Sequence, residues 1–471
     1  MKKAIILSLL FVLSINSEAQ ELWSLERCIL HALEHNLNIQ QAENNITLAE
    51  INQTQNRHQR YPSLNANTGL SSNFGRSIDP ITNDFISTNF LSNNVGISTG
   101  ITVFNGFRIA NSIKQSDIDL SSAELNLEQN KRDIALQVAN TYLNVLFAEE
   151  NLSIAKSQLE NDEQQLIQIQ KLIASGMRPA NESLTIEAQV ALDNQNIITA
   201  ENNITIALLG LKQLLRLDPD VVMQVQAPEN IDVLLDPDAL TFEEVYASAL
   251  KSQPSVQASL KNIESSKLGE EIAEASRYPS VTFGGNVNSN YSNQGRTLDG
   301  FNTTDVDQNI VINGIPATIT TTQQIPNFVD NPYFGQIEEN LFYGFGLNVN
   351  VPIYNNYSTR ANIERAKLNT INTVTQNELL KDQLKTTIQQ ALADARASKR
   401  KLSASEKSLN AQQASFDNAK KSYELGSINN FEFVGQQNAL AQSKVNFLIS
   451  KYEYVFAAKI IDFYMGKPIK L

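Results

Sequence analysis

The chain contains an internal duplication. We therefore expect it to fold as two similar units. Arg60-Tyr61-Pro62-Ser63 recurs 217 residues later as Arg277-Tyr278-Pro279-Ser280. Further along the chain the separation becomes 250 residues, as the pair Gly176 and Gly426 shows. Self-similarity of this kind indicates two copies of one structural unit. The two predicted repeats span 20–235 and 236–471.

The N-terminal segment, 1–19, has the layout of a secretory signal peptide. Lys2 and Lys3 precede an apolar run, 4–15, and small or polar residues follow it. This run is shorter than the roughly 20 residues that a membrane-spanning helix needs. We therefore expect the segment to direct export and to be removed, rather than to anchor the chain.

Each repeat also contains two segments in which apolar and polar residues alternate. In the last of the four, Phe345, Leu347 and Val349 alternate with Gly346 and Asn348. Strands of about 10 residues with one apolar face and one small or polar face are typical of outer-membrane barrels. The four predicted strands span about 64–74, 94–104, 281–291 and 341–353.

The rise in separation from 217 to 250 residues means that the second repeat carries 33 additional residues. They fall between about 292 and 340, in a stretch rich in Asn, Thr, Gly and Asp. Clusters of these residues between periodic segments are typical of loops. We predict a long exposed loop here.

Long heptad repeats follow the strands in both repeats. Val138, Val145 and Leu152 begin a series that continues without a break to Ile173, and Ile388 begins its counterpart. Sustained heptads predict supercoiled helices with knobs-into-holes packing. An uninterrupted helix over 109–174 would be roughly 100 Å long, so it would project from the strands. Gly176 and Gly426 lie where a helical hairpin must reverse, because glycine accepts the left-handed conformation.

Four strands are too few to close a barrel in a membrane, where the smallest barrels have about eight. Because lipid does not tolerate an open sheet edge, the chain must oligomerise. Two copies would supply about 8 strands around a nearly filled interior, whereas three would supply about 12 around an aqueous lumen. The polar strand faces carry mostly Asn, Gly, Ser and Thr, so we favour a homotrimer with a water-filled pore in the outer membrane.

Composition argues against several other functions. The formal net charge of -13 argues against binding of nucleic acid, which needs a basic surface. The single cysteine excludes an intramolecular disulfide. Asn and Gln together number 88, which suggests a large wetted surface of uncharged polar groups. The Asp and Glu residues are scattered, and no arrangement of catalytic residues stands out.

One short pattern could indicate a metal. His31-Ala32-Leu33-Glu34-His35 matches a zinc-protease pattern that places two histidines on one helix face. The second repeat has Ser248, Lys251 and Ser252 at the equivalent positions, and His58 is the only other histidine. We therefore predict no metal site, no cofactor and no enzymatic activity.

Several short motifs occur in a duplicated order: Leu25-Glu26 at a helix start, the Arg-Tyr-Pro-Ser pair, strand ends at 103–106 and 351–355, and the two hairpin glycines. In this order the chain resembles the TolC family of outer-membrane efflux and export channels. The resemblance implies a mainly α fold with membrane β: a trimer with a 12-stranded barrel, a 12-helix α-barrel across the periplasm and a mixed equatorial domain. Residues 217–240 and the C-terminal segment would belong to that domain.

The resemblance further implies a passive exit duct for small molecules or drugs. Such channels dock on a periplasmic adaptor (membrane fusion) protein and an inner-membrane transporter. Protein secretion of type I and heavy-metal efflux remain open within this class. The alternative from another class is a periplasmic coiled-coil scaffold without a pore, which would not need four membrane strands.

The resemblance also assigns residues at the hairpin tips. Glu432 lies six residues after Gly426, where family members place an acid at the pore constriction. Tyr423 matches a latch tyrosine, and its expected partner is Glu182. The family's tip arginine would fall on Ile428, so that link is expected to be absent. Each assignment has a simpler reading: Tyr423 completes a heptad series, and Glu432 lies near a helix N-terminus, where the dipole favours a carboxylate.

Overall fold

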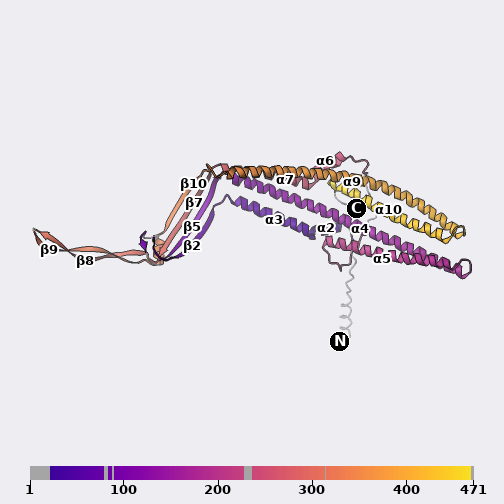
Figure 1. Cartoon of the computed structure of the whole chain (residues 1–471), viewed down its shortest axis with the longest axis horizontal. Coiled ribbons are helices and arrows are strands. Elements are labelled where there is room, and N and C mark those ends of the chain that lie inside the picture. Colours follow the sequence, from indigo (N-terminus) through magenta and orange to yellow (C-terminus); the bar gives the residue numbers. More distant parts are fainter. Residues whose placement is uncertain (1–21, 79–82, 87–89, 228–235, 313, 468–471) are drawn as a thin grey trace, which may run out of the picture. The chain divides into compact units, whose positions relative to one another are not determined.

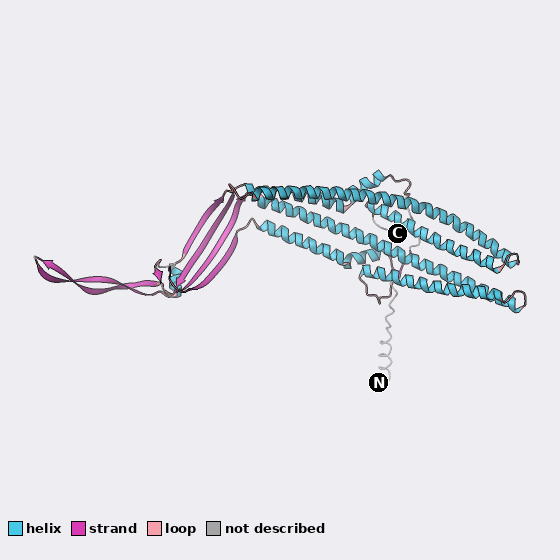
Figure 2. Ribbon diagram, in the orientation of Figure 1, coloured by secondary structure: helices cyan, strands magenta, loops and turns pink. Residues whose placement is uncertain are grey.

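The computed structural model describes residues 22–78, 83–86, 90–227, 236–312 and 314–467. The predicted signal peptide therefore lies outside the described residues. The chain divides into two compact units, each described by itself below. The first contains segments up to Ile51, Asp117–Ser265 and from Asn369 onward; the second contains Asn52–Ser116 and Ser266–Leu368. Figure 2 shows that the first is built mainly of helices and that the strands of the four-stranded sheet lie in the second.

The duplication is visible element by element. A short helix opens each repeat, α2 (Leu25–His35) and α6 (Phe242–Ser252), and a longer one follows, α3 (Leu37–His58) and α7 (Pro254–Glu274). After the strands come two helices of 67 residues, α4 (Arg108–Ala174) and α9 (Ser358–Glu424). Each then pairs with a helix of 35 residues, α5 (Asn181–Leu215) and α10 (Asn430–Tyr464). The equal lengths show that both halves keep the same helical hairpin.

Side-chain caps define where the short helices begin. The Ser24 hydroxyl accepts a hydrogen bond from the Arg27 amide at 3.2 Å. Thr241 and Glu244 form a complete capping box, in which the Thr241 hydroxyl accepts from the Glu244 amide at 3.3 Å and a Glu244 carboxylate oxygen accepts from the Thr241 amide at 2.9 Å. Both contacts satisfy amide groups that a helix leaves without partners.

Four strands form one antiparallel sheet in the order β10-β7-β5-β2. They are β2 (Ser63–Asn73), β5 (Phe90–Asn105), β7 (Ser280–Ser292) and β10 (Phe342–Asn350). Each strand therefore lies near its predicted position, although β10 ends three residues early, ahead of Pro352. One face of the sheet is apolar and uncovered: Phe345 is 84% exposed and Leu347 63%. In a single chain, the outer edges of β2 and β10 are unpaired among the described residues.

On the polar face of this sheet, asparagine side chains lie against glycine residues of the neighbouring strands. Gly96 pairs with Asn67 on one side and with Asn288 on the other. A Cβ atom at Gly96 would lie 2.5 Å from the Asn288 Oδ1 atom, and one at Gly69 would lie 2.6 Å from the Asn94 Oδ1 atom. The glycines therefore leave room for amide side chains to lie flat on the sheet, which explains why these residue types alternate here.

The prediction of a long exposed loop between 292 and 340 is wrong. Most of it forms a long antiparallel ribbon, β8 (Arg296–Ile312) and β9 (Ile315–Asp330), followed by the short helix α8 (Tyr333–Glu339). The polar composition suggested a loop, but β-branched residues are frequent throughout and favour strands. The sequence also carries Asn313-Gly314 between two apolar runs, which is a typical hairpin signal. In Figure 1 the ribbon extends beyond the four-stranded sheet.

Two minor strand pairs are also present. β3 (Ser77–Ile78) pairs with β4 (Phe85–Ile86), and β1 (Leu22–Trp23) pairs in parallel with β6 (Gln224–Val225). The second pair lies over the core of the helical unit. There the Tyr142 hydroxyl donates a hydrogen bond to the carbonyl oxygen of Trp23 at 2.9 Å or of Gln226 at 2.5 Å. A long helix of the first repeat is thereby tied to residues within the expected equatorial segment.

The hydrophobic core of the helical unit consists of two clusters. The larger cluster joins α2, α4, α5 and α10 around Cys28, Val138 and Leu211, all of which are fully buried. The smaller joins α6, α9 and α10 around Ala249 and Ile388. Val138 and Ile388 are equivalent heptad positions, so the heptad pattern marks core-facing residues in both repeats. Among the described residues, no helix has both the length and the hydropathy to cross a membrane.

Candidate functional site at the helical hairpin tips

The two hairpins reverse through the same backbone geometry. Gly176 and Gly426 have φ angles of +74° and +72°, in the left-handed region that favours glycine. The Gly176 amide donates to the Ile173 carbonyl at 2.9 Å, and the Gly426 amide donates to the Tyr423 carbonyl at 3.0 Å. The structure therefore places both glycines at the ends of the long helices, at the predicted tips.

Tyr423 lies at the base of the second tip and packs against an aromatic neighbour. Its ring stacks on Phe433 of α10, with centroids 4.8 Å apart and an angle of 12° between the planes. Its hydroxyl is buried and has no hydrogen-bond partner. Burial raises the pKa of Tyr423 above its ordinary value, although the nearby Arg178 acts in the opposite direction. Tyr423 therefore packs within the heptad core, and its buried hydroxyl group lacks a hydrogen-bond partner.

Arg178 of the first tip connects the two residues assigned to the latch. Its guanidinium lies 5.2 Å from the centroid of the Tyr423 ring and 3.6 Å from the Glu182 Oε1 atom. The Glu182 Oε2 atom, like the Tyr423 hydroxyl, is buried without a hydrogen-bond partner. Tyr423 and Glu182 thus meet at a shared arginine, without a hydrogen bond between them.

An arginine is nonetheless present at the tips. Ile428 indeed cannot supply the charge, but Arg178 is its equivalent in the first repeat, 250 residues earlier. The cation therefore comes from the other hairpin tip. The duplication contained the signal needed to find it, since the same comparison relates Gly176 to Gly426.

Glu432 lies in the first turn of α10 and is exposed. Its amide donates to the Asn429 Oδ1 atom at 2.9 Å, and its carboxylate accepts from the Asn429 side-chain nitrogen at 3.0 Å. This reciprocal contact resembles a capping box, which stabilises the start of a helix. A structural role thus coexists with the position predicted for a constriction residue, and the carboxylate still faces solvent.

A layer of buried polar residues joins the two hairpins farther from the tips, and no sequence pattern predicted it. Asp162 of α4 and Asp193 of α5 are 1% and 3% exposed. Gln437 of α10, in the other hairpin, donates a short hydrogen bond to Asp162. Gln158 and Gln189 donate to Asp162 and Asp193 at 3.0 and 3.1 Å. A residue-by-residue search for charge pairs misses such a layer because its members lie on three different helices.

The contact between the two aspartates changes the pKa of Asp162. Burial, a hydrogen bond with Asp193 and the repulsion of that carboxylate raise the pKa of Asp162 to about 7. The Asp193 Oδ2 atom has no hydrogen-bond partner. Two buried carboxylates in contact cannot both ionise without a large electrostatic penalty, so one retains a proton near neutral pH.

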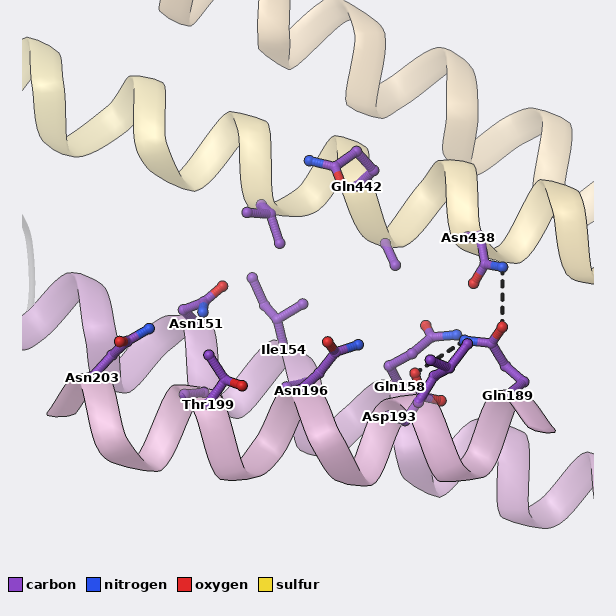
Figure 3. A pocket seen from close by; sticks show the side chains of 15 residues that line it. Asn151, Ile154, Gln158, Gln189, Asp193, Asn196, Thr199, Asn203, Asn438 and Gln442 are labelled. Carbon is purple, nitrogen blue, oxygen red and sulfur yellow. Dashed lines mark hydrogen bonds between the residues drawn. The ribbon is translucent and has the colours of Figure 1, made fainter. Parts of the chain in front are cut away.

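Beside this layer, a groove of about 490 Å³ runs between the α4–α5 hairpin and α10. Figure 3 shows that amide side chains project into it from both sides, and that Asn438 reaches across to Gln189. That hydrogen bond is 3.3 Å long. The residues that line the groove include Asn151, Asn196, Asn203, Gln442 and Thr199. Apolar side chains, among them Ile154, Leu192 and Val445, share the lining with these polar groups, and Asp193 is the only ionisable side chain among the lining residues.

The histidine pattern of α2 does not build a metal site in the described part of the chain. The rings of His31 and His35 stack with centroids 4.2 Å apart, and His31 also packs edge-on against Trp23. No group of three or more His, Cys, Asp or Glu residues suited to holding a metal ion occurs among the described residues.

Comparison with known proteins agrees with this architecture. The profile of the outer membrane efflux protein family matches residues 29–215 and 245–467. The pyoverdine export outer membrane protein OpmQ of Pseudomonas aeruginosa is 24% identical over 374 residues, which cover 77% of this chain and 67% of OpmQ.

Two solved channel structures have the same fold. The structure of CusC superposes with a TM-score of 0.75 at 15% identity, over 94% of this chain and 92% of CusC. The CmeC outer membrane channel of Campylobacter jejuni gives a TM-score of 0.73 at 15% identity, over 94% and 85% of the two chains.

The chain belongs to the outer membrane efflux protein family. It has the fold of the TolC-type channels and is an outer-membrane efflux protein, as the description of its family states. The predicted fold class and location are therefore confirmed. The family is one of transport conduits rather than enzymes.

Proposed function

We propose that this chain forms a homotrimeric duct for small molecules, gated at the hairpin tips. A periplasmic adaptor and an inner-membrane transporter would supply the cargo. The mature chain would follow a signal peptide at 1–19 and consist of the repeats 20–235 and 236–471. The observation that carries the proposal is the four-stranded sheet with two unpaired edges and an uncovered apolar face, because lipid tolerates neither an open edge nor an incomplete barrel.

Three copies supply enough strands for a water-filled lumen. The Asn and Gly residues on one face of the sheet would line that lumen, and the apolar face would contact lipid. The name of OpmQ gives pyoverdine as the compound that it exports. This relationship favours a small-molecule cargo over a folded or secreted protein.

The adaptor contact is assigned to the amide-lined groove. Asn196 and Gln442 project into it from opposite hairpins (Figure 3). A nearly uncharged surface that mixes amide and aliphatic side chains suits an uncharged face of a partner helix, because such an interface forms and separates without burying charge. The neighbouring tip contacts of Arg178 would then respond when a partner separates the hairpins.

The Glu432 carboxylate is assigned to the pore constriction. Three copies around the axis would place three negative charges in one ring, which would attract cations and bind divalent ions. Replacement by alanine (Glu432→Ala) should raise single-channel conductance and weaken block by divalent cations in planar bilayers. The change removes one hydrogen-bond acceptor from Asn429 but leaves the backbone cap in place.

The matched control is Glu424→Ala at the end of α9, which removes an exposed carboxylate on the other side of the same tip. Unchanged conductance and block in Glu432→Ala, or the same change in both variants, would contradict the ring. Native mass spectrometry of the purified protein tests the trimer separately. Co-purification from its own membranes would identify the adaptor and the transporter.

A further inference from the structure

The short helix α8 lies on the apolar face of the four-stranded sheet. Alternation along β7 puts Ser289 and Tyr291 on the same face as Val287. The Ser289 hydroxyl donates to the Ile337 carbonyl of α8 at 2.7 Å, and the Tyr291 ring lies 4.9 Å from the ring of Tyr333. Register places this contact at the end of the sheet opposite the strand ends that lead into α4 and α9.

A second set of contacts fixes α8 to the sheet. The Gln336 side chain is 2% exposed, donates to the Ser292 carbonyl at 2.8 Å and accepts from the Ser292 amide at 2.9 Å. The Tyr333 hydroxyl donates to the Asn93 Oδ1 atom at 2.7 Å, and the Asn93 side-chain nitrogen donates to the Gly69 carbonyl at 3.0 Å. These polar groups are thus paired within the protein. A surface next to lipid requires such pairing, because lipid offers no hydrogen-bond partners.

Exposure changes where α8 begins. Val287 of β7 is 42% exposed, whereas Ser289, two residues further on, is 4% exposed. On α8 itself, Phe334 is 82% exposed, and Tyr333 packs edge-on against it with ring centroids 5.3 Å apart. Leu70 of β2, at the same level of the sheet, is 71% exposed. This level therefore combines aromatic rings, aliphatic side chains and paired polar groups, a mixture typical of the membrane interface of barrels.

The height of the sheet agrees with an interface at this level. Tyr291 lies ten residues after Val281, which belongs to the first apolar row of β7. At about 3.4 Å per residue and a strand tilt of about 40°, this separation spans about 26 Å across a membrane. The apolar band of outer-membrane barrels is about 25 Å tall. A barrel with Val281 at one surface of the membrane would therefore have α8 at the other.

Charge indicates how α8 would contact that surface. The helix contains Glu338 and Glu339 and no basic residue, so anionic headgroups would not attract it. The exposed ring of Phe334 is the group that can enter the boundary between headgroups and acyl chains.

We propose that α8 is an interfacial helix, which binds the lipid surface through Phe334 and marks the limit of the membrane-embedded part of the barrel. The inference rests on the proposed contact between the apolar sheet face and lipid, because α8 continues that face. The β8–β9 ribbon beyond α8 then stands in water. The equivalent connection of the first repeat, 74–89, has no helix among its described residues, so each chain supplies one such anchor.

Spin labels at three positions of the full-length protein in phosphatidylcholine vesicles test this depth. Phe334→Cys places the label on α8, Leu347→Cys places it on the apolar sheet face, and Thr304→Cys places it on the ribbon. The native Cys28 is fully buried, and burial raises the pKa of its thiol to about 12, so it contributes little background labelling. Collisions with oxygen, which dissolves in lipid, and with a water-soluble nickel chelate give the depth of each label.

The label at position 334 should lie within about 5–10 Å of the boundary between headgroups and acyl chains. It should meet the nickel chelate less often than the label at 304 and more often than the label at 347. Equal access of the chelate to 334 and 304 would place α8 in water and overturn the anchor alone. Equal protection of 334 and 347 would place α8 in the hydrocarbon and would also overturn it. Free access to 347 would show that the sheet face does not contact lipid, which overturns the proposed membrane contact together with the anchor.

Fluorescence provides a second measurement without a spin label. The chain has one tryptophan, Trp23, which is 7% exposed in the core of the helical unit, and the unmodified protein gives its background signal. In Phe334→Trp the added fluorescence should be quenched more by lipids brominated near the headgroup than by lipids brominated near the chain ends. Added fluorescence that neither lipid quenches would contradict the anchor.

Discussion

At the scale of single residues, the tip is held by contacts that no local pattern contains. Arg178 pairs with Glu182 within one hairpin and lies over the Tyr423 ring of the other. The ion pair is partly shielded, because the two side chains are 23% and 18% exposed. Since buried oxygen atoms of Glu182 and Tyr423 lack other partners, the arginine is the group on which this contact depends.

Removal of that cation should loosen the tip. In Arg178→Ala the Glu182 carboxylate loses its ion pair while it remains partly buried, which costs more than the pair itself contributes. We expect a higher conductance and more frequent openings in planar bilayers, with Arg178→Lys intermediate because lysine keeps the charge but loses the planar contact with the ring. Lys171→Ala, an exposed lysine in the last turn of α4, is the control. Equal effects of both alanine variants would contradict this role.

At the scale of elements, helix packing decides the chemistry of the polar layer. Asp162, Asp193 and Gln437 come from α4, α5 and α10, and each would be unremarkable on an isolated helix. Packing brings them together and removes them from water, which raises the pKa of Asp162 to about 7. The groups acting on Asp162 are Asp193 from α5, Gln437 from α10 and Gln158 from its own helix. The layer therefore makes the junction of the two hairpins sensitive to pH.

The sign of this effect follows from proton binding. Between the ordinary aspartate pKa of 3.8 and about 7, the unfolded chain has released a proton that the folded chain retains. The stabilising contribution of this site is therefore complete below the ordinary value and is lost as the pH rises through about 7. Asp162→Asn cannot ionise, so its melting temperature relative to the unmodified protein should rise with pH across this window.

Thermal unfolding followed by circular dichroism at several pH values measures the difference. The exposed Asp417 on α9 provides the control, because Asp417→Asn removes a carboxylate that stays in water. A pH dependence of the relative melting temperature that is equal in both variants would show that the buried pair does not retain the proton.

At the scale of the whole molecule, the sheet explains why one chain cannot function alone. Its apolar face is exposed, its two outer edges pair with no other described strand, and on its polar face Asn side chains lie against Gly residues. The excess of Asn and Gln in the composition corresponds in part to this polar face and to the amide-lined groove of Figure 3. Both features suit surfaces that stay wet.

The two faces of β10 should therefore respond differently to charge. Leu347→Lys places an ammonium group on the lipid-facing side, at a cost of about 2–4 kcal/mol near the centre of the bilayer. Asn348→Lys, the next residue along the strand, points to the proposed lumen and should cost little. Unfolding by urea in lipid vesicles measures both free energies. Equal destabilisation would contradict the assignment of the faces.

Local periodicity made much of this architecture predictable. The two repeats, the long helices and their glycine reversals follow from patterns that act over a few residues and recur along the chain. Where the prediction was wrong, a second local signal competed with the first: the polar composition between 292 and 340 suggested a loop, although β-branched residues and an Asn-Gly turn favoured the ribbon.

The sequence by itself determined which helices and strands form and in what order. The reason is that the hydrophobic period and the positions of the glycines depend only on residues close together in the chain. Only the tertiary structure decided that Arg178 meets Tyr423 and that Asp162 meets Asp193 and Gln437. These contacts join residues on separate helices, and their distances depend on how the hairpins pack. Burial then changes the charge state of Asp162, because a pKa depends on the surrounding dielectric and neighbouring charges rather than on the residue alone.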